Sequence, residues 1–435
     1  MNFAVITKQV ESGALQVSQQ VGAMIEWVAQ EEDVAVLQET QARADAIAAY
    51  LSQRSQQSVA EHNAAIKLQL AVKHRLGEVL AKTAKRGRPS DKNLQPVSII
   101  PKELGDTAGQ RQIASYRAQQ VARVPLGSLV AKIDAATEQG KAIKAPGTVL
   151  KEVEREQKSQ EREQRRLEAL QAASPDPGKL VTDASDIDLS LPWQIVLGDC
   201  RNAMEGLPPE SARLVFADPP YNIGVDYGDG KHADALPEDI HAAWAKEWLA
   251  GAHRVLTEDG SLWVLISDEY AAEYVVWAKA IGFALRNWVI WSESFGVQAQ
   301  GKFSRLKRHL LYFTKGKECV FNADAVRVPS ARQEIYDDPR ADPRGKVMGD
   351  IWTDIPRLAG THAERIPSFP TQLPIALPAR VVAVASDPGD LVIDPFNGSG
   401  TTGVACLRAC RRYLGIELRE HFATLAAQRL ESEAS

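Results

Sequence analysis

The stretch that decides the fold of this chain is Arg213-Leu214-Val215-Phe216-Ala217-Asp218-Pro219-Pro220-Tyr221-Asn222. Its first half is short and apolar, which predicts a buried strand that ends at Ala217. Two prolines follow at once, and proline can neither donate a ladder hydrogen bond nor continue a central strand. We therefore expect Asp218, the bare carbonyl of Pro219 and the ring of Tyr221 at the end of a strand, where open α/β sheets bind ligands.

This trio of groups suits chemistry on the exocyclic amine of a nucleic-acid base. Such an amine is a poor nucleophile because its lone pair is delocalised into the ring. The carboxylate of Asp218 and the carbonyl of Pro219 can both accept its hydrogens, and Tyr221 offers a face for an extruded base. A strand followed by a Pro-Pro turn with a solvated Asp would look the same, so this stretch alone leaves both interpretations open.

The composition allows two or three domains and excludes a global polycation. The chain has 435 residues, of which 44% are hydrophobic, enough for sizeable cores. It carries 51 Lys and Arg against 56 Asp and Glu, a formal net charge of −5, so any contact with nucleic acid has to come from local basic patches. The 4 cysteines form no CxxC pair and there are 8 histidines, so we expect neither a metal site nor a disulfide framework.

The sequence contains no recognisable targeting signal. The N-terminus lacks a basic region followed by an apolar one, and no apolar run is long enough to span a bilayer. We therefore expect a soluble, cytoplasmic protein without a membrane partner.

Residues 1–150 are predicted to form an all-α domain, because they are rich in Ala, Gln, Glu and Leu with apolar side chains at helical spacing. Within this domain, residues 100–123 suggest a short helix, a turn and a polar second helix, which resembles the helix-turn-helix segments of phage-type accessory proteins. A helical hairpin without DNA contact would give the same pattern, so both interpretations stay open. The side chains expected to be exposed on the second helix are Arg111, Gln112, Ser115 and Arg117.

Residues 151–191 are predicted to be a charged helical spacer followed by a linker. Residues 151–171 are almost wholly charged and Gln-rich, without the apolar seam of a coiled coil. The stretch Ala173-Ser-Pro-Asp-Pro-Gly-Lys179 breaks the helix, and the acidic residues up to Leu191 are typical of a linker. The domain boundary is therefore expected here.

From residue 192 to residue 435, short apolar runs alternate with helical segments, which predicts a doubly wound α/β domain. We expect a helix over residues 240–256, with Trp244, Trp248 and Leu249 in the core. The expected strands cover residues 194–197, 214–217, 261–266, 288–291, 309–313, 391–393 and 413–416.

A second chemical element is Leu391-Val-Ile-Asp-Pro-Phe-Asn-Gly-Ser-Gly-Thr-Thr402. It predicts a buried strand that ends at Asp394, a turn in which Gly398 and Gly400 let a ligand approach the backbone, and then a helix with free N–H groups. Glu417 ends the next strand, where an acid can accept both ribose hydroxyls of an adenosine-containing cofactor. The loop is too short for a dinucleotide motif, so a cofactor without a phosphate fits better, and a sulfonium would be stable beside Asp394.

Together these two elements resemble those of the S-adenosylmethionine-dependent DNA amino-methyltransferases. The DPPY motif at Asp218 precedes the cofactor motif at Asp394, which is the order of the family's β group, and the resemblance spans residues 193–430. It implies a Rossmann-like, doubly wound methyltransferase domain that binds S-adenosyl-L-methionine and duplex DNA. It assigns catalysis to Asp218, Pro219, Pro220 and Tyr221. It assigns cofactor binding to Asp199, Asp394, Pro395, Phe396, Asn397, Gly398, Gly400, Thr401, Thr402, Glu417, Thr371 and Gln372.

Two further stretches agree with this resemblance. Gly198-Asp199-Cys200 after a strand is similar to the family's GD motif, which places Asp199 near the cofactor adenine. Residues 364–374 together with Arg380 resemble a segment that borders the cofactor, although Phe369 and Leu373 stand where the family usually has His and Lys. A charged contact from those two positions is therefore not expected here.

By the same resemblance, the target-recognition region lies at about residues 227–359. Within it, residues 301–308 interleave basic and aromatic groups, as phosphate contact and base reading require. A solvated hairpin would have the same composition. Residues 226–231 are Gly-rich and polar, and we expect a mobile loop that closes over a flipped base. The DNA-binding candidates of this region are Lys302, Arg305, Lys307 and Arg308.

The expected activity is methylation of adenine N6 in duplex DNA by base flipping, without a metal or a covalent enzyme intermediate. A motif that begins with Asp is the form that the adenine enzymes usually carry. Cytosine-N4 methylation with the same site is the nearest alternative. A DNA-binding regulator with an inert fold is another, and so is a protein-glutamine or RNA methyltransferase, in which the motifs typically come in the reverse order. A homodimer, and an endonuclease of a restriction-modification system, stay open.

Overall fold

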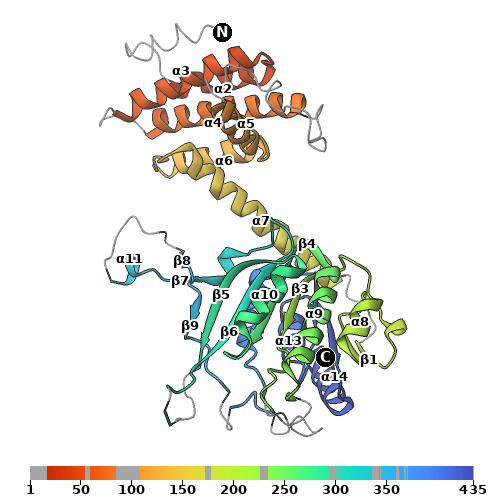
Figure 1. Ribbon diagram of the computed structural model, residues 1–435. Coiled ribbons are helices and arrows are strands. Elements are labelled where there is room, and N and C mark those ends of the chain that lie inside the picture. The colour runs from red at the N-terminus through yellow and green to blue at the C-terminus, as the bar shows by residue number, and fades with distance from the viewer. Residues whose placement is uncertain are drawn as a thin grey trace. The chain divides into compact units, whose positions relative to one another are not determined.

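The structure is a computed structural model that describes residues 17–53, 59–84, 108–171, 178–225, 234–293, 300–301, 303–335, 342, 344–358, 362–366, 369 and 371–434. The chain divides into two compact units, Met1–Glu161 and Arg162–Ser435, and each has its own hydrophobic cores (Figure 1). No helix within the described ranges is both long and apolar enough to cross a membrane.

The first unit consists of helices around a central one, α4 (Val59–Ala84). Buried Asn63 of α4 accepts the N–H of Ile143 (2.9 Å) and donates to the carbonyl of Lys141 (2.9 Å), which fixes the segment that leads into α7 (Pro146–Gln171). Every regular element that the structure describes between residues 17 and 171 is a helix, which confirms the predicted helical N-terminal region. The helices that pack against α4 are α2 (Val17–Gln30), α3 (Val34–Gln53), α5 (Ala108–Ala122) and α6 (Leu126–Glu138).

The helix predicted to read DNA, α5, lies very close to α4. A Cβ on Gly77 of α4 would come within 2.1 Å of the carbonyl oxygen of Ala118, so only glycine allows this approach. Ser115 was expected to be exposed, but it is buried, because it lies one turn before Ala118 on the packed face. Arg117 is exposed. The first helix of the predicted helix-turn-helix and the side chain of Arg111 lie outside the described residues.

The second unit is a three-layer α/β structure around a nine-stranded sheet in the order β1-β2-β11-β10-β3-β4-β6-β5-β9. Its neighbours are parallel except where β6 pairs with β4 and β5. The strands are β1 (Lys179–Val181), β2 (Trp193–Leu197), β3 (Ala212–Ala217), β4 (Leu256–Ile266), β5 (Ala284–Ser292), β6 (Lys307–Thr314), β9 (Ile351–Trp352), β10 (Leu391–Asp394) and β11 (Arg412–Glu417).

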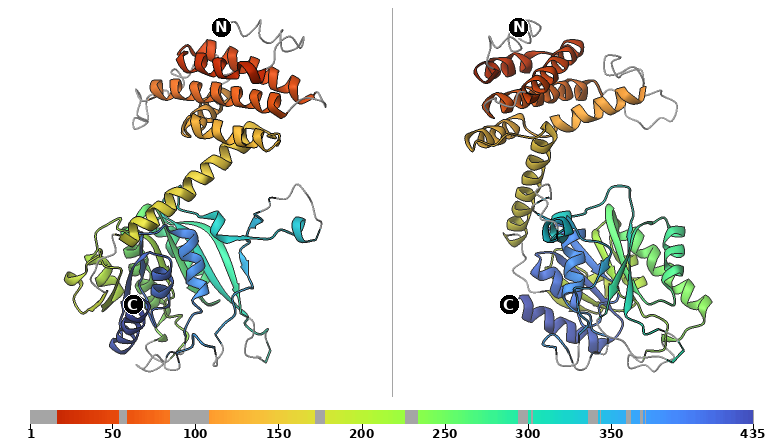
Figure 2. Two further views of the ribbon diagram at one scale, coloured as in Figure 1. Left: turned by 180° about the vertical axis from the view of Figure 1, so that it is seen from behind. Right: turned by 90° about the vertical axis from the view of Figure 1, so that its left-hand side faces the viewer.

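Helices cover both faces of this sheet, as the green and blue helices in the right-hand view of Figure 2 show. One face carries α8 (Cys200–Gly206), α9 (Glu238–Val255) and α10 (Ala271–Ile281). The other carries α12 (Ala376–Ala385), α13 (Thr401–Arg408) and α14 (Glu420–Ala434). A small antiparallel pair, β7 (Arg327–Val328) and β8 (Lys346–Val347), flanks the short α11 (Ala331–Glu334).

The alternation of side chains along a strand explains the two cores. In β3, Leu214 and Phe216 belong to the core under α12, whereas Val215 and Ala217 belong to the core under α9. Successive residues of a strand point to opposite faces, so an apolar run without alternating polar residues is buried from both sides. This is the pattern of a central strand in a doubly wound sheet.

All seven predicted strands are present, and each is longer than the apolar run that predicted it. The prediction that the stretch up to Leu191 is only linker is wrong for β1, which pairs with β2; three residues are too few to show a period. Within residues 227–359, the structure describes four strands of the sheet, β4, β5, β6 and β9, and two helices of one covering layer, α9 and α10. That this range contains the target-recognition region stays a prediction.

The close packing of α4 on α5 gives a test of the first unit. Gly77→Ala should destabilise this unit by about 1–3 kcal/mol, because the added methyl group meets a backbone carbonyl that cannot rotate away. Hydrogen exchange of the α4 and α5 amides, followed by mass spectrometry, should accelerate while the sheet amides keep their rates. The matched control is Gly22→Ala in α2, where a Cβ meets no atom within 4 Å and exchange should slow slightly. Unchanged exchange in Gly77→Ala would contradict the close approach.

Candidate functional site

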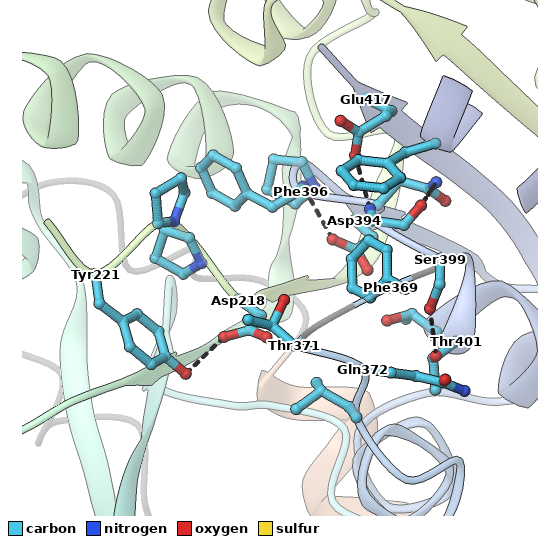
Figure 3. A pocket seen from close by; sticks show the side chains of 18 of the residues that line it. Asp218, Tyr221, Phe369, Thr371, Gln372, Asp394, Phe396, Ser399, Thr401 and Glu417 are labelled. Atoms are coloured by element: carbon cyan, nitrogen blue, oxygen red, sulfur yellow. Dashed lines mark hydrogen bonds between the residues drawn. The ribbon is translucent and has the colours of Figure 1, made fainter. Parts of the chain in front are cut away.

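Acidic residues at four strand ends line one cavity of about 340 Å³ at the carboxyl edge of the sheet. Figure 3 shows Asp218, Asp394 and Glu417 among them. Asp199 follows β2, Glu417 ends β11, Asp394 ends β10 and Asp218 follows β3. These strands are parallel neighbours, so their carboxyl ends come out side by side. The topology thus brings together two motifs that lie far apart in the sequence.

The loop after β3 is held in a fixed conformation. The hydroxyl of Tyr221 donates a hydrogen bond of 2.7 Å to Oδ1 of Asp218. Asn222 has a left-handed backbone with φ 58°, and its side chain bonds both the N–H (2.6 Å) and the carbonyl (3.0 Å) of Leu236. Buried Asp234 accepts the N–H of Asn222 (2.8 Å). These bonds anchor the residue that follows the tyrosine, so the ring and the acid keep their mutual geometry.

The walls of the cavity raise the pKa of Asp218. The loss of water around its carboxyl raises the pKa to about 6, against the opposite effects of the hydrogen bond from Tyr221 and the positive charge of Arg308. At neutral pH, Asp218 is therefore mainly a carboxylate, which accepts hydrogen bonds and donates none. This is the form that an amine donor requires.

The loop after β10 forms a backbone cradle that Glu417 holds in place. Gly398 and Gly400 have φ values of 52° and 75°, which side-chain-bearing residues rarely adopt. One carboxylate oxygen of Glu417 accepts the N–H of Gly398 (2.8 Å), and the other accepts the N–H of Arg419 (3.0 Å). Thr401 then begins α13 and also lines the cavity.

Asp394 is buried between the two loops. Its Oδ1 accepts the N–H of Phe396 (3.0 Å). Burial raises the pKa of Asp394 to about 7, and the negative charges of Asp218 and Glu417 add to the increase, while a hydrogen bond from Thr402 opposes it. Burial likewise raises the pKa of Glu417. A carboxyl group in this state responds to a positively charged ligand by ionising.

The predicted cofactor-binding residues come together at this cavity, apart from Gly400, which shapes the turn behind it. The ones that line the cavity are Asp199, Asp394, Pro395, Phe396, Asn397, Gly398, Thr401, Thr402, Glu417, Thr371 and Gln372.

Three of these side chains are engaged by the protein itself. Asn397 accepts a hydrogen bond from the hydroxyl of Tyr413 (2.8 Å). Gln372 bonds backbone groups of the preceding turn at 2.6 and 2.7 Å. Asp199 is paired with the guanidinium of Arg201 (2.7 Å). These residues therefore shape the cavity by holding its loops.

Aromatic side chains form the apolar walls of the cavity. Phe369, where the family resemblance has His, packs on the glycine loop, and a Cβ on Gly398 would come within 2.8 Å of its ring. Trp244, predicted to lie in the core, also lines the cavity, 5.6 Å from the ring of Phe396. Such walls suit a flat, partly apolar ligand.

The charged residues of the cavity that were not predicted as site residues include Glu293 and Arg357. Glu293 follows β5, is 7% exposed, and pairs with Arg308 (3.3 Å) and Arg357 (3.8 Å). In the β5–β6 hairpin, Ser292 lies opposite Lys307, so the start of β6 comes close to Glu293. Glu293 and Arg308 could not be predicted to pair from the sequence, because only the register of this hairpin brings their opposite charges together.

The described side chains among the predicted DNA-binding cations of residues 301–308 have different surroundings. Arg305 pairs with Glu269, and Lys307 pairs with Asp268 (2.8 Å). Arg308 lines the cavity, because the antiparallel direction of β6 brings the start of that strand to the carboxyl edge of its neighbours. Its contact with DNA stays a prediction.

The remaining DNA-related predictions concern other parts of the chain. Lys302 and the predicted closing loop, residues 226–231, lie outside the described residues. Arg111 and Arg117 belong to α5 of the first unit.

Known DNA methylases are similar to this chain. A family model described as DNA methylase, covering N6 and N4 enzymes, matches residues 212–428. The DNA adenine methyltransferase YhdJ of Escherichia coli (strain K12) is 35% identical over 246 residues, which cover 54% of this chain and 82% of that relative. The type II methyltransferase M.HpaI of Haemophilus parainfluenzae is 31% identical over 242 residues, which cover 55% of this chain and 74% of that relative.

A solved structure, a DNA modification methylase from Thermus thermophilus complexed with S-adenosyl-L-methionine, is 24% identical with a TM-score of 0.41 and covers 55% of this chain and 93% of that chain. The relatives from Escherichia coli and Haemophilus parainfluenzae are matched over most of their own length. This chain therefore belongs to the N6/N4 DNA methylase family.

Proposed function

We propose that this chain transfers a methyl group from S-adenosyl-L-methionine to N6 of an adenine flipped out of duplex DNA, in the cytoplasm. The observation that carries the proposal is that Asp218 and Asp394, at the ends of neighbouring strands, line one cavity with apolar walls. One acid is then available to the amine and the other to the cofactor. We favour adenine over cytosine because the motif begins with Asp218 and because YhdJ is named an adenine methyltransferase.

The residues at the ends of β10 and β11 fit the proposed cofactor. Each oxygen of Glu417 accepts one backbone N–H and keeps a lone pair for a ribose hydroxyl. A Cβ on Gly198 would meet no atom within 4 Å, so this wall offers room, and Phe369 and Phe396 offer apolar surface to a flat base. Ionised Asp394 would be stabilised by a cation. When bound, the cofactor supplies an activated methyl group on a positively charged sulfur.

The loop after β3 would prepare the amine for attack. The carboxylate of Asp218 and the carbonyl of Pro219 accept the two amine hydrogens, which draws the nitrogen toward a tetrahedral geometry and frees its lone pair. The base would stack on Tyr221, which would fix the plane of the ring and with it the direction of the lone pair. After transfer, the surplus proton on the nitrogen leaves through Asp218. The protein therefore contributes mainly positioning and electrostatics.

Labelled cofactor and mixed-sequence duplex DNA test this function. After digestion to nucleosides, the label should lie in N6-methyladenine. Asp218→Ala should lower the transfer rate by about 10³-fold, because both the hydrogen-bond acceptor and its charge are lost, while cofactor affinity changes little. Asp186→Ala, an exposed carboxylate of the same unit, is the matched control with an unchanged rate.

The label can also contradict the proposal. Label in N4-methylcytosine would keep the site and its chemistry and overturn the base. Bound cofactor without label in the DNA would overturn the enzymatic proposal and favour an inert regulator or another substrate. Equal loss of transfer and of cofactor affinity in Asp218→Ala would show that this residue has been assigned the wrong role.

The raised pKa of Asp394 predicts a pH dependence of cofactor binding. A positively charged ligand favours the carboxylate, so binding below the pKa of about 7 requires the release of a proton. The affinity for S-adenosylmethionine should rise up to about tenfold per pH unit below pH 7 and level off above it. Calorimetry in buffers of different ionisation enthalpy measures the proton release directly. Asp394→Asn should abolish the slope and Asp218→Asn should keep it; a slope that survives in Asp394→Asn would refute the assignment.

The organisation of the chain adds two proposals. We propose that residues 1–150 contribute DNA contacts through α5, on which Arg117 is exposed, and that the enzyme acts as a homodimer, as is common in the β group. If Arg117 contacts a phosphate, Arg117→Gln should reduce the slope of log affinity against log salt by about one. An unchanged slope would contradict the DNA contact of Arg117. A monomer in sedimentation velocity would contradict the homodimer.

A further inference from the structure

Arg308 lies in an unusual place for a residue of a basic, loop-flanking segment. It is the second residue of β6, which runs antiparallel to β4 and β5 and therefore starts at the edge where the catalytic loop emerges. Its side chain is 29% exposed and lines the same cavity as Asp218 and Asp394.

The guanidinium of Arg308 covers the ring of Tyr221. Its central carbon lies 5.2 Å from the ring centroid, within the range of a cation–π interaction. The hydroxyl of the same tyrosine donates to Asp218 at 2.7 Å. The cation of Arg308 thus contacts the ring of Tyr221, and the hydroxyl of that ring contacts the carboxylate of Asp218. Among the described residues, the carboxyl of Asp394 also interacts with the charge of Asp218, and Glu417 in turn interacts with Asp394.

A buried acid keeps Arg308 in this position. Glu293 is 7% exposed, and its Oε1 lies 3.3 Å from Nε of Arg308. The backbone N–H of Glu293 donates to the carbonyl of Leu306 (2.7 Å), so the hairpin itself fixes the acid. Arg357 approaches the other oxygen of Glu293 at 3.8 Å. Because an unpaired buried carboxylate is costly, Glu293 favours the conformation in which Arg308 is turned into the cavity.

We propose that Arg308, held by Glu293, is a positioning residue of the catalytic pocket, which fixes the ring of Tyr221 from one face and stabilises the carboxylate of Asp218. This inference rests on the proposed function and assigns the opposite face of the ring to the target base. The positive charge of Arg308 lowers the pKa of Asp218, which burial has raised. Without that charge, Asp218 takes up its proton at a higher pH and stops accepting from the amine.

The test is the pH dependence of kcat/KM for duplex DNA at saturating S-adenosylmethionine, because this ratio then reports the pKa values of the enzyme–cofactor complex and excludes the loss of cofactor affinity below pH 7. In Arg308→Gln the acid limb should move up by about one pH unit, from about 6 to about 7, so the loss at pH 6 should exceed the loss at pH 8 by about fivefold. Arg308→Lys keeps the charge without the planar group, so the acid limb should stay and kcat should fall. Glu293→Gln should lower kcat without moving the acid limb upward.

Arg286→Gln is the matched control on the same hairpin. Arg286 lies at the other end of β5, where it donates to Thr314 (2.9 Å), and its loss should leave the pH profile unchanged. Unfolding midpoints identify any variant that does not fold. If Arg308→Gln does not fold, the kcat values of Arg308→Lys and Glu293→Gln test whether Arg308 positions Tyr221.

The outcomes separate this inference from the proposed function. A wild-type enzyme without methyl transfer to DNA overturns the function itself. With an active wild type, a loss in Arg308→Gln that is equal at all pH values overturns the electrostatic role of Arg308. Wild-type kcat in both Arg308→Lys and Glu293→Gln overturns its positioning of Tyr221.

Discussion

The parallel pairing of β10 with β3 is the constraint on which the rest of the site depends. Val392 pairs with Leu214 and Ile393 with Val215, so the acid that ends β10 and the acid that follows β3 come out at one edge. A shift of one residue would turn Asp394 toward the opposite face of the sheet. This shift is prevented by burial on both faces, since neighbouring residues of each strand belong to two different cores.

The carboxyl groups that this pairing brings together are held in a partly dehydrated state. Burial raises the pKa values of Asp218, Asp394 and Glu417, and each accepts at least one hydrogen bond from the surrounding protein. A ligand that brings a positive charge and N–H donors replaces interactions that these acids have lost from water. The arrangement is thus organised before a substrate arrives, which is the condition for electrostatic stabilisation of a reaction.

The central strands and both motifs could be predicted from the sequence, because a short apolar run that ends in Asp-Pro is a local signal. Strand β1 could not, since three residues are too few to show a period. The burial of Ser115 depends on which face of α5 meets α4, and its polar character favoured the wrong face.

The ion pairs could not be predicted from the sequence for a different reason. The sequence shows Arg305 and Lys307 only as cations, and the fold places their partners Glu269 and Asp268, which follow β4, beside them. The inward direction of Arg308 likewise depends on the antiparallel course of β6. Local composition shows where charged side chains occur, whereas the topology of the sheet determines which of them form ion pairs.

The measurement that tests the central claim most directly is a crystal structure with duplex DNA and a non-reactive analogue of S-adenosylmethionine. We predict a flipped adenine whose amine nitrogen lies within about 3 Å of both the carboxylate of Asp218 and the carbonyl oxygen of Pro219. A target base that remains in the helix, or an amine that faces other groups of the cavity, would contradict it.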